Sequence, residues 1–219
     1  MNERLGERER FLSREEAGRL LDAIAQRETT GLLAPTFADA LRVLLLTGAR
    51  KTEVWGCAGA RWISNARSLA FRPSGPRPGE RQGCDAFTFP PERWPCLARR
   101  KAAQEALEAA DGSPYVFPAA RGSGHATGLR KAFVDVCAAC GLDGVRVHDL
   151  RHSFASFALA DGASLFLIGK ALGHANARTT ERYAHLRGDP LADLAAAVGA
   201  RLAPASSDVD AAVLPFRRA

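Results

Sequence analysis

One stretch of the sequence, FADALRVLLLTGA at residues 37–49, constrains the fold more than any other. Its apolar run is nearly continuous, and a helix that is apolar on every side must be covered by other elements. The run is far too short to cross a bilayer. We therefore expect a deeply buried helix, with Thr36 before it as the N-cap.

The rest of the composition fits a globular protein with a protein-covered core. The chain has 219 residues, of which 47% are hydrophobic and 25% charged, and this suits one domain with short extensions. The net charge of +6 is compatible with a polyanionic partner but does not identify one. The charged N-terminal stretch contains no apolar signal segment, so we expect a cytoplasmic location.

Helical patterns dominate the chain on both sides of a short β region. Ser13 and Glu16 have the spacing of a capping box before an apolar-periodic run. RSLAF and AFTFP, within residues 61–90, are typical of strands joined by a Pro/Gly/Arg loop. Pro95 is expected to interrupt the next helix. Further helices are expected at 129–140, 148–160, 163–172, 179–187 and 190–202. The predicted fold is mainly α with a small antiparallel β-sheet, an α+β architecture.

The cysteines do not indicate a disulfide framework or a metal site. There are five of them, an odd number at scattered positions, which favours reduced thiols. Cys137 and Cys140 have CxxC spacing, but they lie in an amphipathic helical pattern that ends at Gly141, and no second CxxC is present. We expect them to be small apolar residues of a helix.

Several polar residues recur in an order that suits phosphoryl transfer, a reaction that needs cations around phosphate oxygens and a nucleophile. Arg50 follows the apolar helix and would project from a helix start, where free N–H groups favour an anion. His148 and Arg151 are three residues apart, on one helix face. His174 follows Gly173 at a helix end, and the hydroxyl of Tyr183 could attack phosphorus.

Each of these residues, taken singly, also has an ordinary structural explanation. Arg50 could be a solvated charge, His148 a helix cap, His174 a hydrogen-bond donor at a turn, and Tyr183 a core aromatic with its hydroxyl at the rim. Their joint order and spacing carry the functional interpretation.

Three motifs in order, TGARKTEV, HDLRHSFAS and LGHANARTTERYAHL, resemble the catalytic domain of the tyrosine recombinase (phage integrase) family over roughly residues 11–202. The resemblance implies a DNA breaking-rejoining fold with Tyr183 as the nucleophile. It implies that Arg50 and Arg151 clamp the phosphate, with His148 as an acid/base or phosphate-contacting residue. His174 would hydrogen-bond the scissile phosphate, and Glu53 would be a structural brace.

The resemblance also implies a reaction and its partners. Site-specific recombination would proceed by transesterification on double-stranded DNA, through a 3′-phosphotyrosine intermediate and without a nucleotide or metal cofactor. Self-association as a tetramer on two duplexes is implied, in the cytoplasm at the nucleoid, with a possible accessory DNA-binding protein and no membrane. The second of the two tyrosines, Tyr115 in SPYVFP, is expected to lie in a buried structural segment.

The sequence departs from the family at two points. The family places a lysine on the β-hairpin, but the lysines here are Lys51, Lys101, Lys131 and Lys170, all outside residues 61–90. We expect one of three arginines, called the hairpin arginines below, to contact DNA in its place. They are Arg72, Arg77 and Arg81. An arginine clamps charge well but is a poor proton donor.

The second departure concerns the domain organisation. The chain begins at the first helix of the catalytic domain, so we expect residues 1–202 to form that domain, without the N-terminal core-binding domain of the family. Residues 203–219 are expected to be a flexible tail or a partner-docking arm.

Three other functions are compatible with parts of the sequence. The chain could be a catalytically weak integrase-like domain that binds DNA and depends on a partner. It could be a relaxing topoisomerase with a related tyrosine. A helix-turn-helix regulator over residues 148–174 would not require Arg50 or Tyr183.

Overall fold

The computed structural model describes residues 10–55, 62–65, 68–71, 87–89, 95–108, 113, 115–174, 176, 178–184 and 198. The chain divides into two units, residues 1–186 and 187–219, and the helices and strands named below all belong to the first. The predicted mainly helical character is confirmed, and no helix in these ranges is long and apolar enough to span a membrane. The predicted domain boundary after residue 202 lies outside the described residues.

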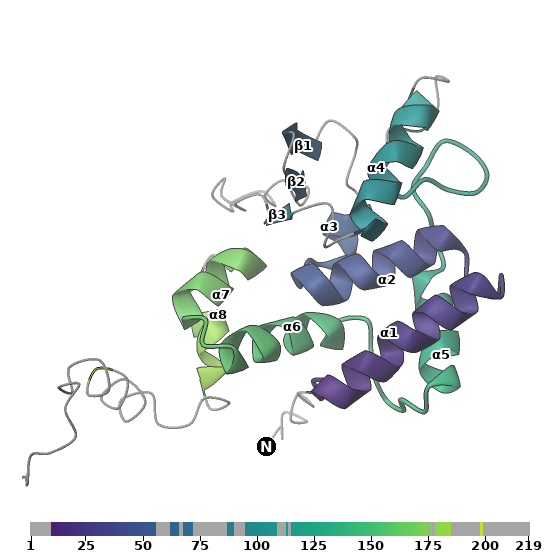
Figure 1. Ribbon diagram of the computed structural model, residues 1–219. Coiled ribbons are helices and arrows are strands. Elements are labelled where there is room, and N and C mark those ends of the chain that lie inside the picture. The colour runs from purple at the N-terminus through teal and green to yellow at the C-terminus, as the bar shows by residue number, and fades with distance from the viewer. Residues whose placement is uncertain are drawn as a thin grey trace, which may run out of the picture. The chain divides into compact units, whose positions relative to one another are not determined.

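Helix α2 (Pro35–Thr47) is the central element (Figure 1), and it is buried as its apolar sequence predicts. It contacts α1 (Arg14–Thr29), α3 (Lys51–Trp55), α4 (Pro95–Glu108), α5 (Leu129–Ala139) and α6 (Asp149–Ala160). Most of its apolar side chains are buried, Leu41 and Leu44 among them. Because helices cover α2 on several sides, the residues that follow its C-terminal end are held in a defined place.

The caps of the first helices differ in how well the sequence predicts them. Ser13 and Glu16 form the expected capping box on α1, since each side chain accepts a hydrogen bond from the other residue's backbone N–H. Thr36 does not cap α2, which begins one residue earlier at Pro35. Pro95 begins α4 and does not interrupt it. Proline suits the first turn of a helix because that turn needs no N–H donor there.

The helices of the C-terminal half follow the predicted order. α5 and α6 begin within one residue of the predicted positions, and α7 (Leu165–Leu172) begins two residues later than predicted. The helix predicted at 179–187 is the short α8 (Arg178–Glu181). Residues 185–197 lie outside the described ranges, as does most of the helix predicted at 190–202.

Three short strands form an antiparallel sheet in the order β1-β2-β3. The strands are β1 (Trp62–Asn65), β2 (Ser68–Phe71) and β3 (Phe87–Phe89). Trp62 pairs with Phe71 between the first two strands, and Phe71 pairs with Phe87 between the last two. The loop that holds the hairpin arginines lies outside the described residues.

A buried ionic cluster joins three of the helices. Asp39 of α2 is fully buried and forms ion pairs with Arg42, Arg99 and Arg100, the last at 2.6 Å. Glu28 of α1 pairs with Arg42 at 2.6 Å and with Arg99 at 2.7 Å. The two carboxylates therefore hold α1, α2 and α4 together through two shared guanidinium groups, those of Arg42 and Arg99, and Arg100 adds a third contact to Asp39.

Asp39→Asn is expected to lower the free energy of unfolding by about 3 kcal/mol, because it removes a fully buried counter-charge shared by three arginines and leaves the buried Arg100 without its carboxylate. Urea unfolding followed by circular dichroism measures this. Asp22→Asn, on the exposed face of α1, is the matched control and should cost less than about 0.5 kcal/mol. Equal effects of the two substitutions would contradict this role for Asp39.

Candidate active site

Arg50 lies in the short connection between α2 and α3 and is held by Glu53. The backbone N–H of Arg50 donates to Glu53 Oε2 at 2.7 Å, and its guanidinium Nη1 donates to Oε1 at 2.7 Å. Glu53 is therefore the structural brace that the sequence leads us to expect. The backbone N–H of Arg50, which the sequence suggests for an anion, is occupied by this carboxylate.

Arg151 is a buried cation on α6 that connects two helix ends. Its Nη1 donates to the carbonyl of Gly48 at 2.6 Å, and its Nη2 donates to the carbonyl of Leu172 at 2.5 Å. Gly48 ends α2 in the left-handed conformation, with φ of 63°. A Cβ there would approach the ring of Phe154 to 2.6 Å, so only glycine fits this corner.

His148 precedes α6 at the N-cap position but makes no capping hydrogen bond through its side chain. The preceding turn is held by the fully buried Asp149, whose Oδ2 accepts from the backbone N–H of Arg146 at 2.8 Å. The imidazole of His148 reaches solvent, yet partial burial lowers its pKa, and the positive charge of Arg151 lowers it further. His148 is thus presented at the surface as a neutral ring near Arg151.

His174 follows Gly173, which ends α7 with φ of 64°. The ring is half-buried, and its Nδ1 lies 2.8 Å from Oγ1 of the buried Thr180. Burial lowers the pKa of His174 to about 4, and the positive charges of Arg151 and Arg50 contribute in the same direction. The imidazole is therefore neutral at physiological pH, and Thr180 fixes its orientation.

Tyr183 follows α8 with its ring in a small apolar cluster formed by α6 and α7. The residue is only 4% exposed and packs with Ala155, Leu159, Ile168 and Leu172. Its hydroxyl lies 2.8 Å from Nδ1 of His152. The ring is thus a core aromatic, as the structural alternative predicts, but its hydroxyl is hydrogen-bonded to a histidine beside Arg151.

The structure brings the five predicted site residues around one centre. Arg50, His148 and Arg151 line one pocket, and Arg151 donates to the carbonyl of Leu172, two residues before His174. Beyond the effect of burial, the charges of both arginines lower the pKa of both histidines. Tyr183 joins this group through His152, whose ring lies 4.9 Å from that of His148 and nearly perpendicular to it. The hairpin arginines belong to residues 72–86, outside the described ranges.

Two residues of this centre are missing from the sequence prediction, namely His152 and Thr180. A signal for His152 is present in HDLRH, because His152 lies four residues after His148, one helical turn further along the helix and on the same face. Thr180 gives no such signal, since a threonine in a polar segment is ordinarily a surface residue.

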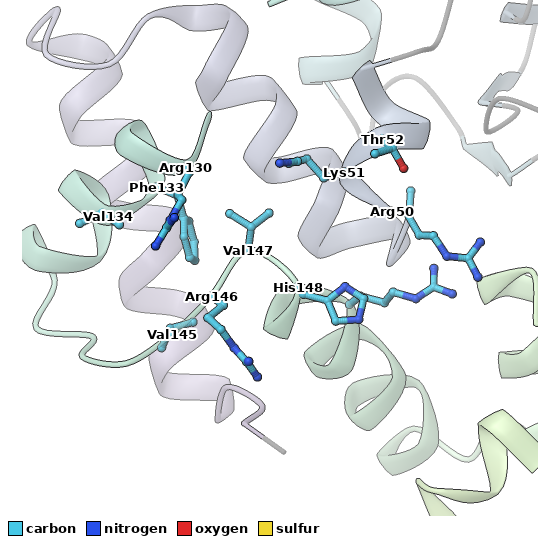
Figure 2. A pocket seen from close by; sticks show the side chains of 12 residues that line it. Arg50, Lys51, Thr52, Arg130, Phe133, Val134, Val145, Arg146, Val147 and His148 are labelled. Carbon is cyan, nitrogen blue, oxygen red and sulfur yellow. The ribbon is translucent and has the colours of Figure 1, made fainter. Parts of the chain in front are cut away.

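A pocket of about 570 Å³ adjoins this centre. Arg50, His148 and Arg151 line it together with three further cations, Lys51, Arg130 and Arg146. Figure 2 shows Arg130 and Phe133 at one end and Arg50 at the other, with Val147 between them. The pocket has an apolar wall and several cations around it, a combination that suits an elongated anion.

Two other sequence features have structural roles. Cys137 is buried on α5, and burial raises the pKa of its thiol to about 12, so it stays protonated. Within the described part of the chain, no three His, Cys, Asp or Glu side chains are placed to hold a metal ion. Tyr115 is partly buried, with its ring 5.7 Å from the ring of His125.

Comparison with known proteins identifies this arrangement. The model of the phage integrase family matches residues 85–189, which include α5–α8 and the HDLRH and RYAHL segments. The chain belongs to the phage integrase family. Among its relatives, the tyrosine recombinase XerD of Rhizobium meliloti (strain 1021) is 33% identical over 195 residues, which cover 84% of this chain and 59% of that protein.

Solved structures show the same fold. The XerH site-specific recombinase bound to difH substrate, in a pre-cleavage complex, superposes with a TM-score of 0.64 and 21% identity, over 84% of this chain and 52% of that one. The catalytic domain of bacteriophage HP1 integrase superposes with a TM-score of 0.54 and 18% identity, over 88% of this chain and 96% of that one. This phage integrase family chain therefore has the tyrosine recombinase catalytic fold, and it spans 59% of the length of the XerD protein.

The pKa of His174 predicts a pH dependence of stability. Above pH 6.5 the imidazole is neutral in the folded and unfolded chains, and its contribution is complete. Between pH 6.5 and about 4 the unfolded chain binds a proton that the folded chain does not, so the free energy of unfolding decreases as the pH is lowered through this range. Relative to His174→Gln, the wild-type chain should lose roughly 1–2 kcal/mol, since solvent screens part of the effect. Urea unfolding at several pH values measures this, and parallel curves would contradict it.

Proposed function

We propose that this chain is the catalytic portion of a site-specific DNA recombinase, which breaks and rejoins strands through a covalent link to Tyr183. The observation that carries the proposal is a centre in which Arg50 and Arg151 lie near two histidines, next to a tyrosine hydroxyl; burial lowers the pKa of both rings, and the two positive charges lower it further. Positive charges held close together stabilise an anion that enters between them. A DNA phosphodiester is an anion that a tyrosine can attack.

Each side chain then has a defined role at the phosphate. Arg151, with its plane fixed by two carbonyls, and Arg50, braced by Glu53, neutralise the non-bridging oxygens as charge develops in the transition state. His174 and His148, being neutral rings, each carry one N–H that can donate to an oxygen of the same group. Preorganisation matters because these donors need not reorient during the reaction.

The reaction is an in-line displacement at phosphorus. The Tyr183 oxygen forms a bond to the phosphorus, the bond to the 5′-oxygen breaks, and a 3′-phosphotyrosine link conserves the energy of the broken phosphodiester. A free 5′-hydroxyl, from the same strand or a partner strand, reverses the step. Strand exchange follows when the hydroxyl comes from the partner.

We further propose how the rest of the chain takes part. The cations of the pocket, Lys51, Arg130 and Arg146, bind phosphates that flank the scissile one. The three-stranded sheet presents its loop to DNA, and a hairpin arginine replaces the family's hairpin lysine there. Assembly on two duplexes as a tetramer, with help from an accessory DNA-binding protein, completes the proposal.

Covalent trapping tests the chemistry. The chain is incubated with a pool of duplexes of randomised sequence that carry a nick next to every potential cleavage site, so that cleavage releases a short 5′-hydroxyl fragment and cannot be reversed. We expect a protein–DNA adduct that survives denaturation, and its DNA can be sequenced to identify the preferred site. Tyr183→Phe should abolish the adduct because it removes the attacking oxygen.

Tyr115→Phe is the matched control, since the chain has two tyrosines and Tyr115 lies away from the centre. It should give the adduct at the wild-type yield. Retention of DNA without any adduct would support the alternative of a binding domain that depends on a partner. An adduct that persists in Tyr183→Phe would contradict the assignment of the nucleophile.

A further inference from the structure

The side chain of His152 lies at the hydroxyl of the proposed nucleophile. Its Nδ1 lies 2.8 Å from the Tyr183 oxygen, a distance typical of a good hydrogen bond, and the two ring centroids are 5.9 Å apart. Tyr183 itself is 4% exposed, so access of bulk water to its hydroxyl is restricted. The imidazole therefore lies where the proton of the phenol must go when the oxygen attacks.

Helix α6 determines the position of this imidazole. His152 follows Arg151 directly, and the guanidinium of Arg151 is fixed by the carbonyls of Gly48 and Leu172. The ring of His148, one turn earlier on the same helix, contacts the ring of His152 nearly at right angles. His152 is thus placed by the same helix turn that carries the proposed phosphate clamp, and its rotation is restricted by a neighbouring ring.

The chemistry of the attack requires a proton acceptor at this point. A phenol is a weak nucleophile until its proton is removed, and positioned general bases accelerate such steps by about 100-fold or more. Arginine is a poor base because its guanidinium stays protonated, and Arg151 and Arg50 are held by carbonyls and a carboxylate. An imidazole exchanges a proton readily near neutral pH.

We propose that His152 is the general base for Tyr183. As the Tyr183 oxygen forms its bond to phosphorus, the hydroxyl proton passes to Nδ1 of His152. The bond from phosphorus to the 5′-oxygen breaks, and that oxygen takes a proton from solvent water. In the reverse step the imidazolium returns the proton to the tyrosine oxygen as the phosphotyrosine bond breaks. The inference rests on the proposed function, because it assigns a residue to the same cleavage.

The rate of adduct formation under single-turnover conditions tests this role, with the same randomised pool of nicked duplexes. His152→Asn places an amide near the position of Nδ1, so it can keep a hydrogen bond to Tyr183 but cannot take its proton. We expect it to slow adduct formation by about 100-fold while DNA retention stays unchanged. His152→Ala should be equally slow, and imidazole in the buffer should restore part of its rate.

The controls separate a chemical role from a structural one. His125→Asn, at a histidine beside Tyr115 and outside the centre, should cleave at the wild-type rate. A His152→Asn rate within threefold of wild type would overturn the proposal. Slow variants without rescue of His152→Ala by imidazole would also overturn proton transfer, since a lost contact alone is not restored by a free base.

A second measurement does not depend on cleavage, so failure of the proposed function can be told apart from failure of this inference. ¹⁵N NMR of the histidine side chains in the DNA-free chain reports which nitrogen carries the proton. We expect His152 to carry it on Nε2, with Nδ1 as the acceptor, and we expect Tyr183→Phe, but not Tyr115→Phe, to shift the Nδ1 signal. A proton on Nδ1 would show that His152 donates to the tyrosine, and would overturn its role as the base.

Discussion

The hydrogen bonds of Arg151 to two backbone carbonyls are the interaction on which the rest of the centre depends. By joining the carbonyls of Gly48 and Leu172, the guanidinium of α6 fixes the C-terminal ends of α2 and α7. Arg50 follows the first of these ends and His174 follows the second, so both inherit their positions from Arg151. Arg151 therefore has two roles: its hydrogen bonds connect two helix ends, and its buried positive charge is available to the proposed phosphate.

The positive charges that prepare this centre for an anion also repel one another, and this repulsion destabilises the folded chain. Burial lowers the pKa of His174 to about 4, and the positive charges of Arg151, Arg50 and Arg182 contribute in the same direction. Two carboxylates of the described residues near this centre already make hydrogen bonds, Glu53 with Arg50 and Asp149 with the turn before α6. This repulsion is offset by the stability of the folded core, in which helices pack around α2 and the Asp39 ion pairs join α1, α2 and α4.

The sequence predicts the elements of this account better than their contacts. The apolar run of α2, the Ser13 capping box and the order of α5–α7 follow from periodicity and local hydrogen bonding. The cap of α2 and the role of Pro95 were predicted wrongly because two local signals competed, and the structure uses proline at both helix starts. The bond between His152 and Tyr183 joins residues 31 positions apart, and no periodicity encodes such a pairing.

The most direct test of the central claim is to identify the amino acid that becomes linked to DNA. The denatured adduct is digested with protease and nuclease, and the remaining nucleotide-bearing peptide is sequenced by mass spectrometry. The account predicts a 3′-linked nucleotide on the phenolic oxygen of Tyr183. A nucleotide on any other residue, or a 5′-linked nucleotide on Tyr183, would contradict it.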